Sequence, residues 1–413
     1  MPTHDRRTSA AAPASSARHE TILRLYAPER PSGRPPARVL ALAGLLIAAL
    51  VTAAAATAAG SGQRIPDRLA DGEFWKLVED LSEPGGFFRS ENFVSNETTF
   101  QWVIPDLTST ARTGGVYLGV GPEQNFTYIA ALQPKIAFIV DIRRQNMLQH
   151  LLYKSVMERS ADRADFVSRL FSRPRPAGLD TAATAAELFA AFEPVEPDSA
   201  TFWKNVAAVR EHLVEQKKLR LTDEDLRTID YVYFAFYAAG PYLNYSFSPT
   251  RGGYGGRRMP TIGELMAETD GDGVARSFLA SEANYRVLRD LHRRNLIVPV
   301  VGDFAGDKAL RAVGKYVRDG NATISAFYTS NVEQYLFQQG DDWRRFFDNV
   351  ATLPVDERST FIRAVFNYSY ISRDRGGRPG PRSVTLLHSI PDAVQAFSEG
   401  RIQSYYDVVQ MSR

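Results

Sequence analysis

The chain has 413 residues, of which 44% are hydrophobic and 23% are charged, as in ordinary globular proteins. The 49 Lys and Arg residues nearly balance the 47 Asp and Glu residues, giving a net charge of +2. This balance gives no electrostatic case for nucleic acid as the main partner. The chain has no cysteine, which excludes disulfides, thiolate catalysis and cysteine-based zinc or iron–sulfur sites.

The N-terminal part differs in composition from the rest of the chain. Residues 1–38 are rich in Ala, Pro, Ser and Arg without hydrophobic periodicity, which predicts a disordered basic tail. Residues 39–60 carry no charge and would measure about 33 Å as a helix, enough to cross a bilayer. We expect a transmembrane signal-anchor here. A cleaved signal peptide is the alternative, because the second half of the segment consists of small residues.

The charges that flank this segment predict its orientation. Seven arginines precede it, whereas only Arg64, Arg68 and Lys76 follow it in residues 61–80. The more basic flank of a membrane span stays in the cytoplasm. We therefore expect a single-pass membrane protein with a short linker, 61–72, and a main domain, 73–413, on the extracytoplasmic (periplasmic) side.

The main domain is organised around residues 114–147, which read as strand, glycine turn, helix and strand. A short apolar run ends at Gly119 and Gly121, and a second run ends on Asp141. An acidic residue about 20 positions after the glycines can accept hydrogen bonds from ribose hydroxyls. The helix that follows the glycines offers free backbone N–H groups to a ligand.

On these residues the stretch resembles the class I S-adenosylmethionine-dependent methyltransferases, in which a glycine-rich turn follows the first strand and an acid ends the second. It is also similar to an uncharacterised bacterial family within that superfamily. Two positions depart from the pattern, since Tyr117 stands where an acid is usual and Glu123 where a third glycine is usual. A Rossmann-like unit that binds no nucleotide is the alternative.

The resemblance implies a set of residues around S-adenosylmethionine. The expected cofactor-binding residues are Gly119, Gly121, Glu123, Asn125, Asp141, Asp303 and Phe304. Asp303 follows the third predicted strand, where an acid contacts the adenine amino group in the resembled family. The end of the fourth predicted strand positions the substrate in that fold, so Ser330, Asn331 and Tyr335 are the expected catalytic residues. An ordinary helix N-cap at Ser330 or Asn331 is the alternative.

Two further segments are candidates for substrate contact. Residues 87–107 precede the first strand, and the resemblance places Asn96 and Glu97 over the cofactor. The alternative is a surface segment with a capping motif, 95–98, that starts a helix. Residues 231–258 run from an aromatic helix into a glycine- and arginine-rich loop, where Tyr254 and Arg257 are expected to recognise an anionic or aromatic ligand. A floppy loop is the alternative.

The remaining pattern predicts an α/β fold with a mostly parallel sheet covered on both faces. It is a Rossmann-like domain of methyltransferase type with a helical insertion at about 161–282, after the second strand. Later strands are expected at 296–301, 322–328, 360–370, 383–388 and 405–409. The resembled fold has only one helix where the insertion lies, and such insertions tend to cover the ligand site.

No metal site is predicted. His150 and His212 lie on expected helices without a second ligand four residues on, and His388 has no identified partner. The acidic turn that begins at Asp270 lacks the carboxylate that a calcium loop needs at its twelfth position, so a polar turn is favoured.

The sequence therefore predicts a membrane-anchored, methyltransferase-like protein with a small-molecule ligand. Methyl transfer to an oxygen or nitrogen nucleophile depends on in-line positioning more than on acid–base chemistry, so a shortage of histidines is no objection. A non-catalytic extracytoplasmic domain that binds a ligand or partner is the alternative. The predicted topology favours this alternative, because S-adenosylmethionine is made inside cells.

Overall fold

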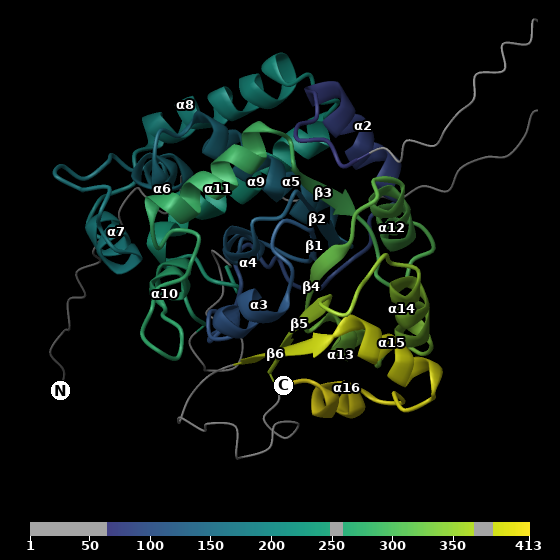
Figure 1. Cartoon of the computed structure of the whole chain (residues 1–413). Coiled ribbons are helices and arrows are strands. Elements are labelled where there is room, and N and C mark those ends of the chain that lie inside the picture. Colours follow the sequence, from purple (N-terminus) through teal and green to yellow (C-terminus); the bar gives the residue numbers. More distant parts are fainter. Residues whose placement is uncertain (1–63, 248–258, 367–382) are drawn as a thin grey trace, which may run out of the picture. The chain divides into compact units, whose positions relative to one another are not determined.

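The computed structural model describes residues 64–247, 259–366 and 383–413 (Figure 1). The basic tail, the predicted membrane anchor and the substrate candidates Tyr254 and Arg257 lie outside the described residues. Within these three ranges, none of the helices has both the length and the apolar character needed to cross a membrane.

A six-stranded sheet forms the centre of the domain, with strand order β3-β2-β1-β4-β5-β6. The strands are β1 (Val116–Gly119), β2 (Ile136–Asp141), β3 (Ile297–Val301), β4 (Ile324–Ser330), β5 (Thr360–Val365) and β6 (Val384–Ser389). Strands β1 to β5 pair with one another in parallel, and β6 runs antiparallel to β5. The predicted α/β class with a mostly parallel sheet is thus confirmed.

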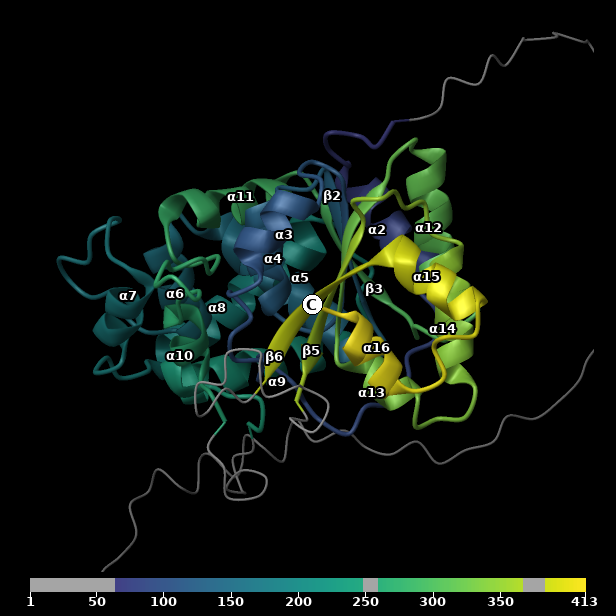
Figure 2. The same cartoon turned by 60° about the horizontal axis from the view of Figure 1, so that its bottom comes forward.

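Helices cover both faces of this sheet, as Figures 1 and 2 show. One side carries α4 (Gln124–Leu132), α5 (Arg144–Arg159) and α11 (Glu282–Arg293), and the other carries α12 (Ala309–Asp319), α14 (Asp342–Ala351) and α15 (Ile390–Ser398). Every residue of β1, β2 and β3 is buried. Strands buried on both faces need continuous apolar runs, which is why these segments show no polar alternation.

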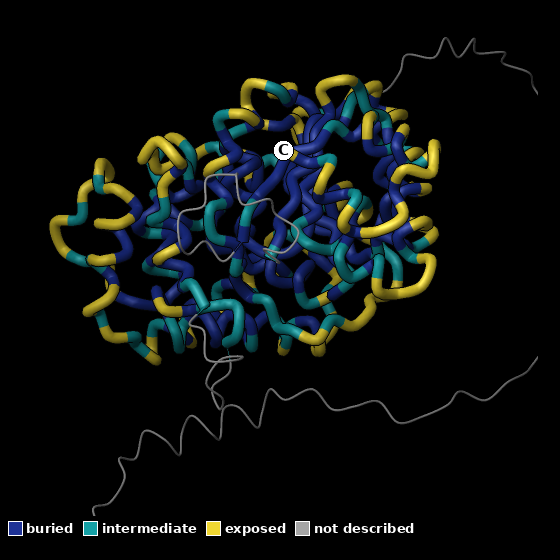
Figure 3. Tube along the Cα trace, turned by 90° about the horizontal axis from the view of Figure 1, so that it is seen from below, coloured by how far each residue is buried: buried dark blue, intermediate teal, exposed yellow. Residues whose placement is uncertain are grey.

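Other helices also lie near the sheet. They are α2 (Asp71–Leu81), α3 (Ile104–Thr110), α13 (Val332–Leu336) and α16 (Tyr405–Met411). Figure 3 shows the buried part of the trace in the interior of the domain and exposed segments at the periphery, and strands β1, β2 and β3 are wholly buried. The apolar core of the domain therefore lies at the sheet.

Further helices lie between α5 and α11, in the long connection from β2 to β3. They are α6 (Arg163–Phe171), α7 (Ala185–Phe192), α8 (Ser199–Arg210), the π-helical turn η1 (Glu211–Gln216), α9 (Asp223–Ala239), the 3-10 turn η2 (Gly240–Tyr242) and α10 (Ile262–Ala267). They occupy residues 163–267, where the sequence led us to expect a helical insertion at about 161–282.

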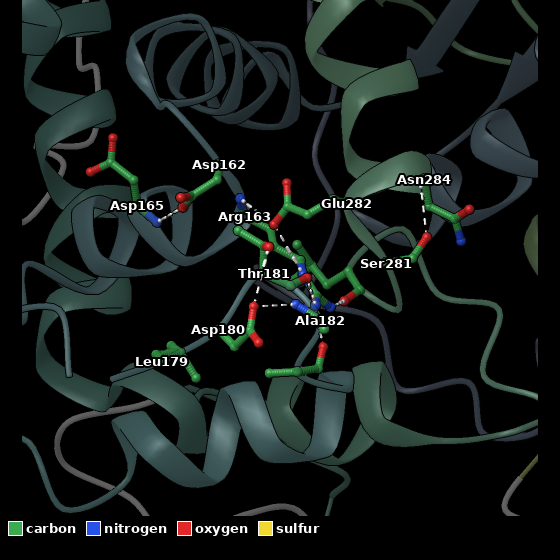
Figure 4. A network of polar contacts seen from close by, with 12 residues as sticks. Asp162, Arg163, Asp165, Leu179, Asp180, Thr181, Ala182, Ser281, Glu282 and Asn284 are labelled. Atoms are coloured by element: carbon green, nitrogen blue, oxygen red, sulfur yellow. Dashed lines mark hydrogen bonds and ion pairs between the residues drawn. The ribbon is translucent and has the colours of Figure 1, made fainter. Parts of the chain in front are cut away.

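A buried arginine ties this helical segment together (Figure 4). The Arg163 guanidinium donates to the Leu279 carbonyl at 2.7 Å, to the Thr181 carbonyl at 2.8 Å and to the Glu282 carboxylate at 3.1 Å. These acceptors belong to segments before α7 and at the start of α11. One side chain therefore joins three parts of the segment that are distant in sequence.

The last predicted strand, 405–409, is wrong, because these residues form helix α16. The Ser404 side chain accepts from the Asp407 backbone N–H, and the Asp407 carboxylate accepts from the Ser404 backbone N–H. This capping box starts a helix whose buried face, Tyr405, Val408 and Val409, has helical spacing. The local cap and tertiary packing outweigh the strand propensity of the aromatic and β-branched residues.

Candidate functional site

A cavity of about 570 Å³ lies at the carboxyl ends of the parallel strands. Its lining includes the residues that directly follow or end each of β1, β2, β3 and β4, together with the 87–97 segment. Strand β1 pairs with β2 on one side and with β4 on the other, so the strand order reverses at this point. Open α/β sheets bind ligands in the crevice at such a reversal, and the volume is in the range of small-molecule sites.

Most of the predicted site residues meet at this cavity. The predicted residues that line it are Asn96, Glu97, Gly121, Asp141, Asp303, Phe304, Ser330, Asn331 and Tyr335. Gly119, Glu123 and Asn125 are buried and are not part of the lining. The structure thus brings the ends of four strands and the segment before β1 to one place.

Gly121 forms the part of the glycine turn that faces the cavity. Its φ is +77°, a left-handed conformation that side chains other than glycine rarely adopt. A Cβ at this position would lie no closer than 3.8 Å to its nearest neighbour, the Asn92 Nδ2. The backbone here is therefore accessible from the cavity, and glycine is required by conformation rather than by crowding.

Gly119 and Asn125 shape the turn from its buried side. The Asn125 amide donates to the carbonyls of Val120 at 2.9 Å and Pro122 at 2.7 Å, and its Oδ1 accepts from the Tyr117 hydroxyl at 3.0 Å. A Cβ on Gly119 would lie 1.8 Å from Asn125 Oδ1. The Asn125 side chain thus fills the space that a Cβ on Gly119 would need. The Tyr117 hydroxyl holds this side chain in place from within the core.

His150 also fixes the turn. Its Nε2 lies 2.9 Å from the Gly121 carbonyl oxygen. Burial lowers the pKa of His150 to about 4, so the ring is neutral at pH 7 and donates this hydrogen bond from Nε2. The histidine has a structural role here.

Asp141 lies in the cavity wall, and Arg143 binds its carboxylate. The Arg143 backbone N–H and Nε donate to Asp141 Oδ1 at 2.8 Å and 3.0 Å, and Nη2 donates to Oδ2 at 2.8 Å. Arg143 also donates to the Glu91 carbonyl at 2.7 Å. The predicted ribose acid is therefore already neutralised and held in one orientation.

Asp303 and Phe304 follow β3. The Asp303 N–H donates to the Glu83 carboxylate at 2.7 Å, and Asp303 Oδ1 accepts from the Ala305 N–H at 2.9 Å. The Phe304 ring packs in the core, parallel to Phe346 with ring centroids 5.7 Å apart. Asp303 thus presents a half-buried carboxyl group to the cavity, whereas Phe304 contributes mainly to packing.

The cavity wall also contains a buried carboxyl group, Glu97. Its Oε1 accepts from the Tyr328 hydroxyl at 2.7 Å and from the Ser330 hydroxyl, and its Oε2 accepts from Gln124 Nε2 at 2.6 Å. Burial raises the pKa of Glu97, and the three hydrogen bonds oppose that rise. Ser330 has a φ of +52°, a strained conformation of the kind that clusters at functional sites.

Glu123 lies in the buried region next to the segment that carries Glu97. Its Oε1 accepts from the Ser95 backbone N–H at 3.1 Å, and its Oε2 has no hydrogen-bond partner among the described residues. Burial raises the pKa of Glu123 to about 7, and the nearby Glu97 charge adds to that rise although the Ser95 bond opposes it. The predicted contact between Glu123 and a cofactor is therefore indirect at most.

The 87–97 segment does not have the alternative structure considered from sequence, because no helix begins at Ser95. The Ser95 hydroxyl instead donates to Gln124, and it accepts from the Glu97 N–H at 3.2 Å. The segment therefore contributes side chains to the cavity without regular secondary structure.

Several lining residues were not predicted. They are Phe88, Arg89, Asn92, Arg143, Met259, Gln339 and Phe366, among others, whereas Tyr245 belongs to the 231–258 segment that was expected to contact a ligand. Tyr335 packs edge-to-face on Phe88 at 5.4 Å, and Arg89 lies over the same tyrosine at 5.8 Å. Arg143 is the residue that sequence could have indicated, because it stands two positions after the acid that ends β2.

The described residues contain no group of three or more His, Cys, Asp or Glu side chains that could hold a metal ion. Asp270 Oδ1 accepts from the backbone N–H groups of Asp272 at 2.9 Å and Val274 at 2.8 Å. The Asp270 carboxylate therefore satisfies backbone N–H groups of its own turn.

Comparison with known proteins gives one family match. A family model described as "Domain of unknown function (DUF7790)" matches residues 92–233 and 254–399, which include all six strands. No curated protein matches the sequence. Because the match covers more than half of the chain, the chain belongs to the DUF7790 family, a domain family of unknown function.

Proposed function

We propose that the cavity binds S-adenosylmethionine and that the protein is a methyltransferase of the Rossmann-like type. One observation carries the proposal: Gly121, Asp141 and Asp303, which follow or end β1, β2 and β3, line the same cavity. These are the positions at which the sequence resembles the superfamily. The order of the strands, with its reversal beside β1, supports the same proposal.

The residues of the cavity fit such a ligand in part. The Gly121 turn leaves room for close approach, Asp303 would receive the adenine amino group, and Asp141 would receive the ribose hydroxyls. Asp141 Oδ2 accepts from Arg143 Nη2, and a carboxylate oxygen can accept a second hydrogen bond. The bound donor would supply an electrophilic methyl group, and Ser330, Asn331 and Tyr335 would position the acceptor.

A second function is a non-catalytic binding domain. The Arg143–Asp141 pair favours it, because this arginine already satisfies the carboxylate that a ribose would need. The buried Tyr117 favours it too, since it replaces an acid with a core hydrogen-bond donor. In this version the cavity would take a small ligand without methyl transfer.

Calorimetry on the full-length protein in detergent separates the two functions. We expect S-adenosylmethionine to bind with a micromolar Kd, and Asp141→Ala to weaken binding at least tenfold, which is about 1.4 kcal/mol. Asp272→Ala, a change at an exposed acid outside the cavity lining, is the matched control. If S-adenosylmethionine does not bind at millimolar concentration, the methyltransferase proposal is rejected. The non-catalytic binding domain then remains as the proposed function.

The location of the domain is a separate part of the proposal. We propose a single membrane anchor at 39–60 with the main domain on the extracytoplasmic side, because basic residues accumulate before the anchor. A topology reporter fused after Arg413 tests this. Reporter activity in the cytoplasm would reverse the proposed topology and place the domain where the methyl donor is made.

A further inference from the structure

Glu97 is a buried carboxyl group in the cavity wall that has no cationic partner among the described residues. Its side chain is 2% exposed, and its hydrogen-bond donors, Tyr328, Ser330 and Gln124, are all neutral. Burial of a carboxylate is costly unless a cation or a proton compensates its charge. No described residue supplies such a cation, so within the described structure a proton or a ligand must compensate the charge.

A second acid adds to this imbalance. Glu123 is fully buried, one of its oxygens has no partner in the described structure, and the other accepts a single backbone hydrogen bond from Ser95. Each of the two acids makes the ionised form of the other less favourable. This end of the cavity therefore favours the arrival of positive charge.

The arginines that line the cavity do not neutralise these acids. Arg143 is bound to Asp141 and to the Glu91 carbonyl. Arg89 is exposed and lies over the Tyr335 ring at 5.8 Å. The cations of the wall are thus engaged elsewhere, and the lining also includes Tyr328 and Tyr335, whose rings attract cations.

The end of β4 is shaped around Glu97. Tyr328 and Ser330 both donate to the same Glu97 oxygen, from positions 231 and 233 residues away in sequence. To do so, Ser330 adopts a φ of +52° at the last position of the strand. An ordinary surface turn does not need a strained residue that orients a buried carboxyl group. The strain at Ser330 therefore indicates that the orientation of Glu97 matters for function.

We propose that Glu97 is a specificity-determining residue that receives the positively charged part of the ligand, a sulfonium or a protonated amine. The sulfonium form of this inference rests on the proposed function, and the amine form does not. If Asp141 and Asp303 take the nucleoside at the ends of β2 and β3, the charged end of the donor falls toward β1 and β4. Glu97 lies at that side of the cavity through its contacts with Tyr328 and Ser330.

The test compares S-adenosylmethionine, which carries the sulfonium charge, with S-adenosylhomocysteine, which lacks it. Both are titrated into the full-length protein and into Glu97→Gln at pH 8 by calorimetry. We expect Glu97→Gln to lower the ratio of the two affinities about tenfold, equivalent to ~1.4 kcal/mol. An unchanged ratio would overturn the inference. Glu268→Gln is the matched control, because Glu268 is half-buried, has a raised pKa of about 7 and does not line the cavity.

A second probe separates this inference from the proposed function. Tetramethylammonium chloride is followed by ligand-observed NMR with the wild-type protein and with Glu97→Gln. If neither nucleoside binds, the methyltransferase proposal fails. In that case, binding of tetramethylammonium that depends on Glu97 would still support the inference. If tetramethylammonium does not bind in this way, the inference is wrong. Should Glu97→Gln not fold, Asn96→Lys places a competing cation on the same segment and must produce the same loss, whereas Asp272→Lys, at an exposed position outside the cavity lining, must not.

Discussion

Arg143 binds both carboxylate oxygens of Asp141, two residues after the strand that Asp141 ends. The arginine therefore closes a small ring at the carboxyl end of β2, and the ring forms part of the cavity wall. Both side chains are less than one-tenth exposed, so the pair is held in a region of low dielectric. Its removal has consequences for both stability and binding.

Removal of the arginine alone should be more damaging than removal of the pair. Arg143→Ala leaves the Asp141 carboxylate buried without its cation, and we expect a loss of about 3 kcal/mol in the free energy of unfolding. The double variant Asp141→Asn with Arg143→Ala should lose less than the sum of the single variants. Urea denaturation of the four proteins measures this coupling, and additive losses would show that the pair makes no joint contribution.

The glycine of the turn should matter for binding beyond its effect on stability. Gly121→Ala places a side chain at a φ of +77°, and Gly178→Ala does so at a φ of +75° on an exposed loop. Each should lower the free energy of unfolding by about 1 kcal/mol, because left-handed backbone is costly for alanine. Only Gly121→Ala should weaken ligand binding, because Gly121 alone of the two lines the cavity. Equal calorimetric affinities in the two variants would contradict this role.

The pKa of Glu123 predicts a pH dependence of stability. Burial raises this pKa from 4.5 to about 7, so the folded protein binds more protons than the unfolded chain between these values, and stability falls as pH rises through them. Glu123→Gln removes this contribution. The variant should gain about 2 kcal/mol relative to wild type between pH 5 and pH 8. Urea denaturation at both pH values measures the gain.

A control for this pH experiment is Glu357→Gln, which changes an exposed glutamate. Its stability difference from wild type should be the same at both pH values. If Glu123→Gln behaves in the same way as Glu357→Gln, the buried carboxyl group does not titrate as described.

Helix α16 should depend on its N-cap. Ser404→Ala removes the side chain that accepts from the Asp407 N–H, and we expect a loss of about 1 kcal/mol in the free energy of unfolding. Ser398→Ala, at the exposed last residue of α15, should have a much smaller effect. Equal effects in urea denaturation would argue against the capped helix and favour the strand that the sequence suggested.

The central sheet could be predicted from sequence because its strands are buried on both faces. Continuous apolar runs at 116–120 and 136–140 leave little ambiguity when a glycine turn and a helix separate them. The acid at the end of the second run, Asp141, then falls at the carboxyl edge of the sheet by geometry alone. The family resemblance pointed to Asp303 and Ser330 at the ends of the next two strands, and all three residues line the cavity.

Side-chain partners could not be predicted in the same way. The hydrogen bond from Ser330 to Glu97 joins residues 233 positions apart, and no local pattern contains that contact. Gly119 and Gly121 are both glycines, yet Asn125 fills the space beside Gly119 and leaves the space beside Gly121 open. Residues 405–409 were mistaken for a strand because aromatic and β-branched side chains suit a helix face equally well once Ser404 caps it.

The most direct measurement is a crystal structure of the protein soaked with S-adenosylhomocysteine. The account predicts the nucleoside in the cavity between the ends of β1, β2 and β3, with a ribose hydroxyl on the Asp141 carboxylate and the adenine beside Asp303. A cavity that stays free of ligand at millimolar concentration, or a nucleoside bound away from Asp141, would contradict it.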